Sequence, residues 1–111
     1  MSLSASVLLA PCLAFATSAV ADNNLADRHA QKGLKCAQCH VEKVPSGAPK
    51  MDSCLKCHGG SYEELGTASA ERTPNPHYTH VGDKECAVCH KGHKAPDFFC
   101  NDCHKFNVQV P

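Results

Sequence analysis

The sequence predicts one small domain that consists mostly of irregular coil and short α-helices, with little or no β-sheet. Aromatic residues make up only 5% of the 111 residues and Trp is absent, so side chains alone can form only a modest core. Nine residues are Cys, a content typical of a disulfide scaffold, a metal cluster or covalently attached cofactors. Eight of the nine recur in four short motifs, which leaves little chain between the motifs for a sheet.

The charged residues exclude one large class of partners. Eleven Lys and Arg balance eleven Asp and Glu, and the sequence contains no long block of like charge. A nucleic-acid-binding arm would need a basic block, because its affinity comes from neutralising phosphates. We therefore expect no nucleic acid partner.

The N-terminal segment, residues 1–21, contains no charged residue and ends with the small residues Ala19 and Ala21 at the positions of a signal-peptidase site. The usual basic residue near the start is absent. Lipid attachment at Cys12 is disfavoured by the preceding proline and by the apolar run that continues past it. This run is too short to span a bilayer comfortably. We therefore expect a signal peptide at 1–21, a periplasmic domain at 22–111, and no stable membrane insertion after cleavage.

The first helix of the exported domain is expected close to its N-terminus. Asn23 or Asn24 can cap a helix that carries Leu25 and His29. Gly33 lies just beyond the expected end of this helix, where glycine commonly terminates helices.

Four repeats of the pattern C-x-x-C-H follow this helix. Residues i and i+3 lie on one face of a helical turn, so both thiols of a motif can reach the two vinyl groups of one porphyrin. The histidine at i+4 then lies beneath the iron as its proximal ligand. Because the pattern is the signature of covalent c-type haem attachment, we expect four haem c groups. The anchoring residues are Cys36, Cys39, Cys54, Cys57, Cys86, Cys89, Cys100 and Cys103, and the proximal ligands are His40, His58, His90 and His104.

Two other kinds of site could use the same cysteines. Four C-x-x-C pairs could form two zinc sites of four thiolates each, but zinc needs no histidine directly after the second Cys, and here it follows in every motif. Disulfides within each motif would be of the strained, redox-active kind, and disulfides between motifs would leave the four histidines unexplained. Haem attachment explains both residue types.

The segments between the motifs have their own signals. Residues 44–49 contain Pro and Gly and are expected to be a loop. Ser61 and Glu64 form a capping-box pattern that opens a helix to about Ala70, and the prolines beyond it end the helix. Residues 59–85 separate the two pairs of motifs and contain two further histidines, so we expect a ligand-bearing connection rather than a domain boundary.

Four histidines lie outside the motifs, and they are His29, His77, His80 and His93. Four six-coordinate haems need four distal ligands, and Met51 is the only Met after the signal peptide, so at most one haem can have His/Met ligation. We therefore expect four bis-histidine haems with these residues as distal ligands. His29 and His93 each precede a motif by seven residues, but the count does not decide which distal histidine serves which haem.

Bis-histidine ligation predicts electron transfer rather than catalysis, because two protein ligands leave no open position on the iron. It also predicts low reduction potentials, since the thioether ligand that raises potentials is absent, and low potentials favour anaerobic respiration. The competing hypothesis is a haem enzyme with one open coordination site.

Four macrocycles within residues 22–111 must touch or nearly touch, because a domain of this length has a radius of gyration of only about 12 Å. The haems would then replace the missing apolar core. The full fold prediction is a multihaem cytochrome c in which coil and short helices wrap around four haems.

The pattern resembles the tetrahaem cytochromes c that occur as small periplasmic carriers and as the haem domain of soluble flavocytochrome c fumarate reductases. The resemblance covers the whole exported domain. It rests on an early helix with His29 and on the steps His77–His80, Cys89–His93 and Cys103–Phe106. It implies that the non-motif histidines are distal ligands and that the haems form a continuous path for electrons.

In the fused reductases a flavin-binding domain follows, whereas this sequence stops at Pro111. We therefore expect either a general carrier that serves several reductases or the haem subunit of a reductase with a separate flavoprotein. The segment Lys105–Pro111 resembles the lead into the flavin domain and favours the second interpretation. The resemblance implies a membrane quinol-oxidising cytochrome as electron donor.

Overall fold

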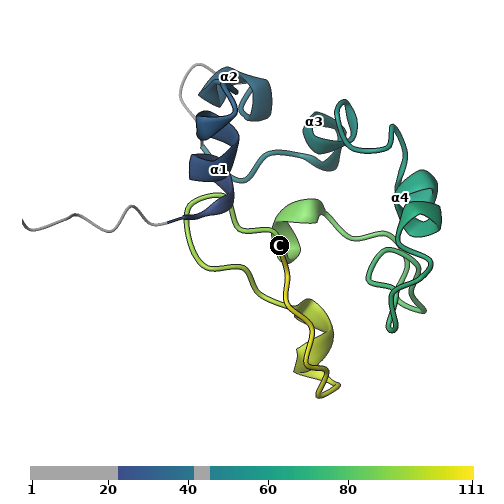
Figure 1. Ribbon diagram of the computed structural model, residues 1–111. Coiled ribbons are helices and arrows are strands. Elements are labelled where there is room, and N and C mark those ends of the chain that lie inside the picture. Colours follow the sequence, from purple (N-terminus) through teal and green to yellow (C-terminus); the bar gives the residue numbers. More distant parts are fainter. Residues whose placement is uncertain (1–22, 42–45) are drawn as a thin grey trace, which may run out of the picture.

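The structure is a computed structural model that describes residues 23–41 and 46–111. The predicted signal peptide with Cys12, and the first residues of the predicted loop at 44–49, lie outside the described residues. Within the described ranges the chain forms short helices joined by long irregular segments, without a strand (Figure 1). This confirms the predicted fold class. The helices are α1 (Leu25–Gln31), α2 (Cys36–Cys39), α3 (Met51–Leu55), α4 (Tyr62–Ala68) and the 3₁₀ helices η1 (Cys86–Val88) and η2 (Phe99–Asp102).

Helix α1 starts and ends where the sequence predicts and makes one contact with a distant segment. It begins directly after Asn24, but the predicted cap is not formed, because the Asn24 side chain makes no capping hydrogen bond. Gly33 beyond its end has a φ of 87°, in the left-handed region that favours glycine. The N–H of Ala26 donates a hydrogen bond of 2.8 Å to the carbonyl of Gly92. This bond joins the first turn of α1 to the segment that follows the third motif.

Helix α4 begins where the sequence predicts it. The Oγ of Ser61 accepts a hydrogen bond of 3.1 Å from the N–H of Glu64, which satisfies one of the free donors of the first turn. The helix ends at Ala68 rather than near Ala70. The N–H of Ala70 bonds instead to the carbonyl of Thr67 at 3.2 Å, so the last turn tightens and the chain leaves the helical path.

The described side chains form almost no hydrophobic core. Phe98, with 6% of its surface exposed, is the one buried hydrophobic side chain in the described ranges, and it packs edge-on against Phe106 with ring centres 6.3 Å apart. The helices lie around the middle of the molecule, with η1 near its centre (Figure 1). A chain that buries so little apolar surface is not stabilised by its own side chains. This agrees with the prediction that bound groups supply the core.

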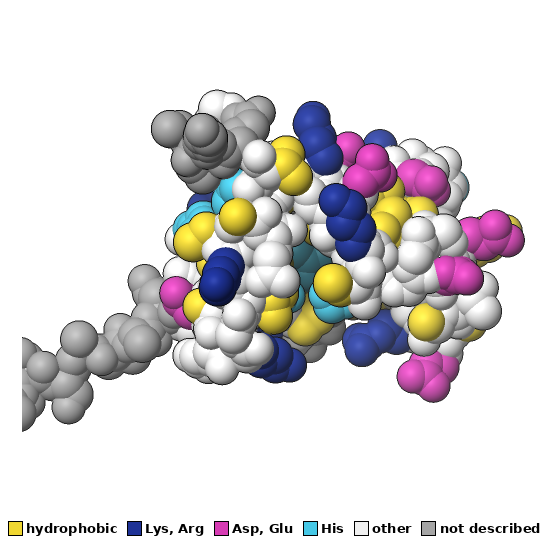
Figure 2. All heavy atoms as spheres, turned by 90° about the horizontal axis from the view of Figure 1, so that it is seen from above, with side chains coloured by type: hydrophobic (Ala, Val, Ile, Leu, Met, Phe, Trp, Pro, Cys, Tyr) yellow, Lys and Arg dark blue, Asp and Glu magenta, His cyan; other side chains and the backbone are white. Residues whose placement is uncertain are grey.

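Charge and histidine are unevenly spread over the surface. Figure 2 shows histidine side chains near the middle of the face viewed, with acidic side chains gathered toward the side of α4. Glu63 and Glu64 in the first turn of α4 belong to this acidic side. Within the described ranges, none of the helices is long and apolar enough to cross a membrane.

Candidate functional site

Each C-x-x-C-H motif forms one tight helical turn with the same hydrogen bond. In all four motifs the N–H of the histidine donates to the carbonyl of the first cysteine, four residues earlier. This is the local geometry expected for two thiols and an imidazole that serve one bound group. The N···O distances are 2.8 Å for His40, 3.0 Å for His58, 2.8 Å for His90 and 2.8 Å for His104.

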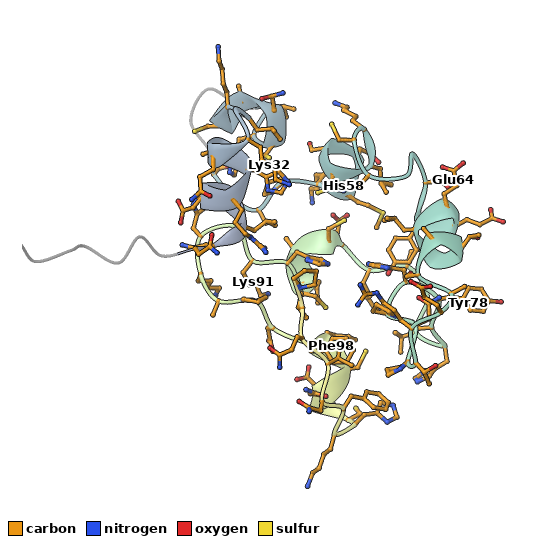
Figure 3. All side chains as sticks on the ribbon, viewed as in Figure 1. Lys32, His58, Glu64, Tyr78, Lys91 and Phe98 are labelled. Atoms are coloured by element: carbon orange, nitrogen blue, oxygen red, sulfur yellow. The ribbon has the colours of Figure 1, made fainter. Side chains whose placement is uncertain are left out.

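Every motif histidine faces one histidine from outside the motifs. The eight rings form four pairs with none left over. His58, which lies next to α3 (Figure 3), pairs with His29 of α1. The distances between ring centres are 6.0 Å for His29 and His58, 6.3 Å for His40 and His93, 6.4 Å for His77 and His90, and 6.0 Å for His80 and His104.

These distances fit one metal ion between the rings of each pair. A first-row metal lies about 2.0–2.1 Å from an imidazole nitrogen, and the ring centre lies roughly 1 Å beyond that nitrogen. Two imidazoles on opposite sides of one ion therefore have centres roughly 6 Å apart. All four pairs have this spacing although they belong to different segments of the chain.

The pairs fall into two classes of ring orientation. The rings of His40 and His93 are inclined by 12°, and those of His77 and His90 by 10°. The other two pairs are close to perpendicular, with angles of 74° at His29 and 65° at His80. No pattern in the sequence indicates this division.

Hydrogen bonds at Nδ1 fix the protonation of two non-motif histidines. The Nδ1–H of His29 donates to the carbonyl of Leu25 at 2.8 Å, because a carbonyl oxygen can only accept. The Nδ1 of His77 lies 3.1 Å from the hydroxyl of Ser69. A proton on Nδ1 leaves the lone pair of Nε2 free to bind a metal.

Burial favours the neutral form of two of the imidazoles, because it lowers their pKa. It is the main reason that the pKa of His77 lies below its usual value, and His90 and Arg72 lower it further. Burial also lowers the pKa of His90, more than a backbone hydrogen bond at Pro111 raises it. The neutral form is the one that binds metals.

The motifs follow one another in space in their order along the chain. Helix α2 packs against α3, and α3 packs against η1. Burial, together with the neighbouring Cys86 thiol, raises the pKa of Cys54 to about 11. Burial also raises the pKa of Cys39, and the nearby Cys54 raises it further. In the same way, burial raises the pKa of Cys100, and the nearby Cys89 adds to this effect. Successive motifs therefore lie side by side, the first by the second, the second by the third and the third by the fourth.

The two alternative uses of the cysteines find no support in this geometry. The eight cysteines in the described ranges are free thiols. Nowhere in these ranges do three or more His, Cys, Asp or Glu side chains gather closely enough to hold a metal ion by themselves. Two zinc sites of four thiolates would require such clusters.

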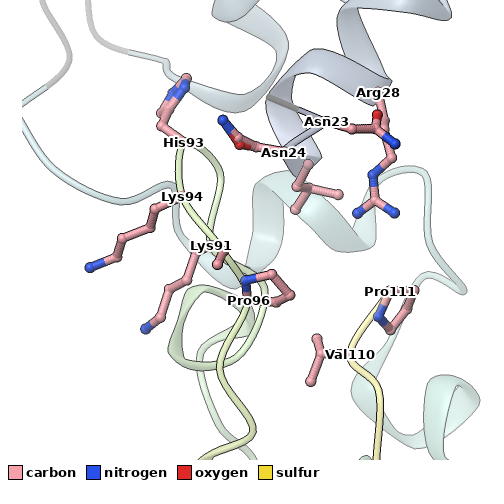
Figure 4. Close-up of a pocket in the computed structure, with 11 residues that line it drawn as sticks. Asn23, Asn24, Arg28, Lys91, His93, Lys94, Pro96, Val110 and Pro111 are labelled. Atoms are coloured by element: carbon pink, nitrogen blue, oxygen red, sulfur yellow. The ribbon is translucent and has the colours of Figure 1, made fainter. Parts of the chain in front are cut away.

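A basic cavity that the sequence does not predict lies beside one histidine pair. It has a volume of about 560 Å³ and lies between the start of α1, the segment after the third motif and the last two residues (Figure 4). Arg28, Lys91 and Lys94 line it together with His93. The Nε of Arg28 and the Oδ1 of Asn24, both residues of this lining, are buried without a hydrogen-bond partner.

A second cavity, of about 410 Å³, has Cys39 and His40 in its lining. The two cavities therefore border the two members of the same pair, His40 and His93. The first cavity combines apolar walls with basic side chains. Such a lining suits haem, because the apolar walls can contact the porphyrin ring and the basic side chains can pair with its carboxylates. The lining residues come from distant parts of the sequence, so no local pattern could have shown this arrangement.

Comparison with known proteins agrees with this chemistry. The model of the cytochrome c3 family matches residues 28–105. A probable fumarate reductase of Shewanella frigidimarina, Ifc3, is 39% identical over 84 residues, which are 73% of this chain and 14% of that protein. The cytochrome c-type protein Cgr1 of Eggerthella lenta is 34% identical over 67 residues, which are 59% of this chain and 31% of that protein. The chain thus spans less than a third of the length of either relative.

Proposed function

The chain belongs to the cytochrome c3 family, whose members transfer electrons through covalently bound c-type haems, and we propose that it binds four of them, each with two axial histidines. The observation that carries this proposal is the set of four histidine pairs with ring centres 6.0–6.4 Å apart, each containing one motif histidine. Four motifs with four pairs match four haems.

We also propose a distal ligand for each motif, which counting alone left open, and the histidine pairs support this choice. Each haem is anchored by the two cysteines of its motif and held by the proximal histidine that follows them. The distal partners are His93 for His40, His29 for His58, His77 for His90, and His80 for His104.

A bound haem c supplies a reversible one-electron change between ferric and ferrous iron. The residues of the chain hold that iron in one coordination state. With a haem bound, the two imidazoles of each pair would both hold its iron and leave no position for a substrate, so the site would suit electron transfer rather than catalysis. Arg28, Lys91 and Lys94 provide positive charge near the pair of His40 and His93, where haem carboxylates would otherwise be unpaired.

The order of the motifs in space supports a single path for electrons. Cys39 lies near Cys54, Cys54 near Cys86, and Cys89 near Cys100, so each motif adjoins the next. We infer that electrons pass along the chain of haems in the order of the motifs, with the first and fourth haems at the two ends.

We further propose that the protein is exported to the periplasm through the signal peptide at 1–21 and receives electrons from a membrane quinol-oxidising cytochrome. As acceptor we propose a separate flavoprotein of the fumarate reductase kind. The support for this acceptor is the 39% identity to a protein named a probable fumarate reductase. A general carrier that serves several reductases is the alternative.

Carbon monoxide tests the coordination proposal. The dithionite-reduced protein should carry four haems by mass spectrometry and should bind no carbon monoxide promptly, because every iron has two imidazoles. Prompt binding at one haem in four would instead indicate an enzyme with an open site.

Co-purification tests the partner. Periplasm from cells grown without oxygen is passed over the immobilised holoprotein at low salt and at high salt. A flavoprotein retained at low salt and released at high salt is expected, because transient electron-transfer contacts are small and polar. Recovery of several unrelated reductases would favour the general carrier, and recovery of no flavoprotein would defeat the proposed acceptor while leaving the haem assignment intact.

A further inference from the structure

His77 is held by several contacts from α4 and the turn that follows it. Its ring lies edge-on to Tyr62, with ring centres 5.9 Å apart at an angle of 82°. Gly66 allows the close approach of α4, since a Cβ at this position would lie 3.1 Å from the carbonyl oxygen of His77. The backbone N–H of His77 donates to the Oδ1 of Asn75 at 3.0 Å, and the Nδ2 of Asn75 donates to the carbonyl of Gly66 at 2.8 Å. His77 is therefore positioned by the chain itself.

Ser69 is at the centre of this network. It is the one buried polar residue in the described ranges, with 8% of its surface exposed. Its Oγ lies 2.6 Å from the carbonyl of Leu65, 3.0 Å from the Oδ1 of Asn75 and 3.1 Å from the Nδ1 of His77. Both oxygen neighbours are acceptors, because the Asn75 amide is oriented by its bond to Gly66.

The direction of the bond between Ser69 and His77 follows from these partners. A hydroxyl has one proton, and here that proton is directed to one of the two oxygen acceptors. The Oγ of Ser69 is then left to accept, so the proton between Ser69 and His77 belongs to Nδ1. The Nε2 of His77 is then the nitrogen without a proton, and the ring plane of His77 is inclined by only 10° to that of its partner His90.

We propose that Ser69 is a positioning residue that sets the tautomer and ring orientation of His77 and lowers the reduction potential of one haem, the one attached to Cys86 and Cys89. This rests on the function proposed above. An acceptor on Nδ1–H makes the imidazole a stronger electron donor through Nε2, which stabilises ferric over ferrous iron. The bond from Ser69 to Leu65 strengthens this effect, because a hydroxyl that donates becomes a better acceptor.

The non-motif histidines differ in this respect. The Nδ1 of His29 donates to a backbone carbonyl, which no side-chain substitution removes. In the described part of the chain, His80 and His93 have no hydrogen bond at Nδ1. A substitution of Ser69 can therefore change the reduction potential of one haem without altering the ligands of its iron.

The test compares three variants of the holoprotein. Ser69→Ala removes the hydroxyl, and Ser69→Thr keeps it. The matched control is Thr67→Ala in α4, two residues before Ser69, because the Thr67 hydroxyl also bonds to the carbonyl four residues earlier, that of Glu63 at 3.1 Å, and no hydrogen bond joins it to a histidine. The four haems are titrated individually by NMR of partly oxidised samples, with the His77 haem identified by its nuclear Overhauser contacts.

In Ser69→Ala the equilibrium constant for reducing the His77 haem should rise by up to about tenfold, which for one electron corresponds to about 59 mV. The other three potentials, the haem count and the low-spin spectrum should remain those of the wild type. Ser69→Thr should restore the wild-type value, and Thr67→Ala should leave it unchanged. Equal shifts in all four reduction potentials, or no shift larger than that of Thr67→Ala, would overturn the role of Ser69. If the variant still contains four low-spin haems in that case, the proposed function is unaffected.

A measurement on the wild-type protein covers the case in which Ser69→Ala does not assemble. In the reduced, diamagnetic protein labelled with ¹⁵N at histidine, the Nδ1–H of His77 should give a resonance that exchanges more slowly with water than those of His80 and His93. Exchange as fast as theirs would refute the hydrogen bond on which the proposal depends.

Discussion

The two classes of ring orientation predict two classes of ferric haem in equal amounts. Two iron d orbitals can interact with the π systems of the imidazoles. Parallel imidazole planes interact with the same one of these orbitals and separate the two in energy, whereas perpendicular planes interact with one orbital each and leave the two nearly equal in energy. Parallel pairs should therefore give a rhombic low-spin EPR signal, and perpendicular pairs a signal with much larger anisotropy. With inclinations of 12° and 10° in one class and 74° and 65° in the other, each class should account for half of the integrated spins.

Replacing one distal histidine links this division to the ligand assignment. In His93→Ala, one of the two parallel pairs is lost, so the rhombic signal should fall by half, which is about a quarter of all spins. The anisotropic signal should keep its full intensity, because the pairs of His29 and His80 are unchanged. The iron of that haem would keep one imidazole ligand, so one haem in four should become high-spin and, once reduced, should bind carbon monoxide.

His29→Ala is the control, because it should halve the anisotropic signal and spare the rhombic one. The assay is spin quantification of the fully oxidised proteins at low temperature against a copper standard. Loss of the same signal in both variants would refute the assignment of distal ligands. A single class of signal in the wild type would refute the ring orientations but not the bis-histidine coordination.

Three further predictions concern stability. Protein made without the haem-attachment machinery should show poorly dispersed amide resonances and no cooperative melting. The reason is that Phe98 is the one hydrophobic side chain buried in the described ranges. A well-dispersed amide spectrum would contradict a core made of haem. Phe98→Ala in the holoprotein should lower the free energy of unfolding by about 3 kcal/mol and loosen the fourth motif, measured by denaturant titration with Phe106→Leu as a milder comparison. Ser61→Ala should cost about 1 kcal/mol through the lost cap of α4, and Ser61→Asp should restore it; equal stability of all three forms would contradict the capping role.

The helices that the sequence predicts are those with a local signal at their start. Ser61 caps α4 as expected, because a cap acts within a few residues and is readable from the sequence. Helix α1 begins after Asn24 as expected, but the side chain of Asn24 makes no capping hydrogen bond. Helix α3 was missed. Its five residues, Met51–Leu55, are too few to show an apolar period, and the N–H of Met51 is bonded by the carboxylate of the distant Glu85 at 2.8 Å. A helix placed by such a contact leaves no local pattern.

For the site, the sequence predicts residue types but not their partners. Spacing identifies the motifs, and the number of histidines suggests that the other four act with them, but pairing depends on how distant segments meet. His29 and His93 each precede a motif by seven residues, yet the structure pairs neither with the motif that follows it. The bond between Ala26 and Gly92 shows why, since it brings α1 beside the segment of the third motif. The role of Ser69 likewise becomes visible only when α4 meets His77.

In the proposed arrangement, the histidine pairs that hold the haems also link distant segments of the chain. With almost no apolar core in the described ranges, the segments need another source of attachment, and three of the four pairs join residues that are well separated in the sequence. A ligated pair acts like a crosslink, because it closes a loop of chain and lowers the conformational entropy of the unfolded state. Coordination strength and stability are therefore coupled at each haem. In this proposal each of the eight histidines serves both coordination and stability, because every one of them belongs to a pair.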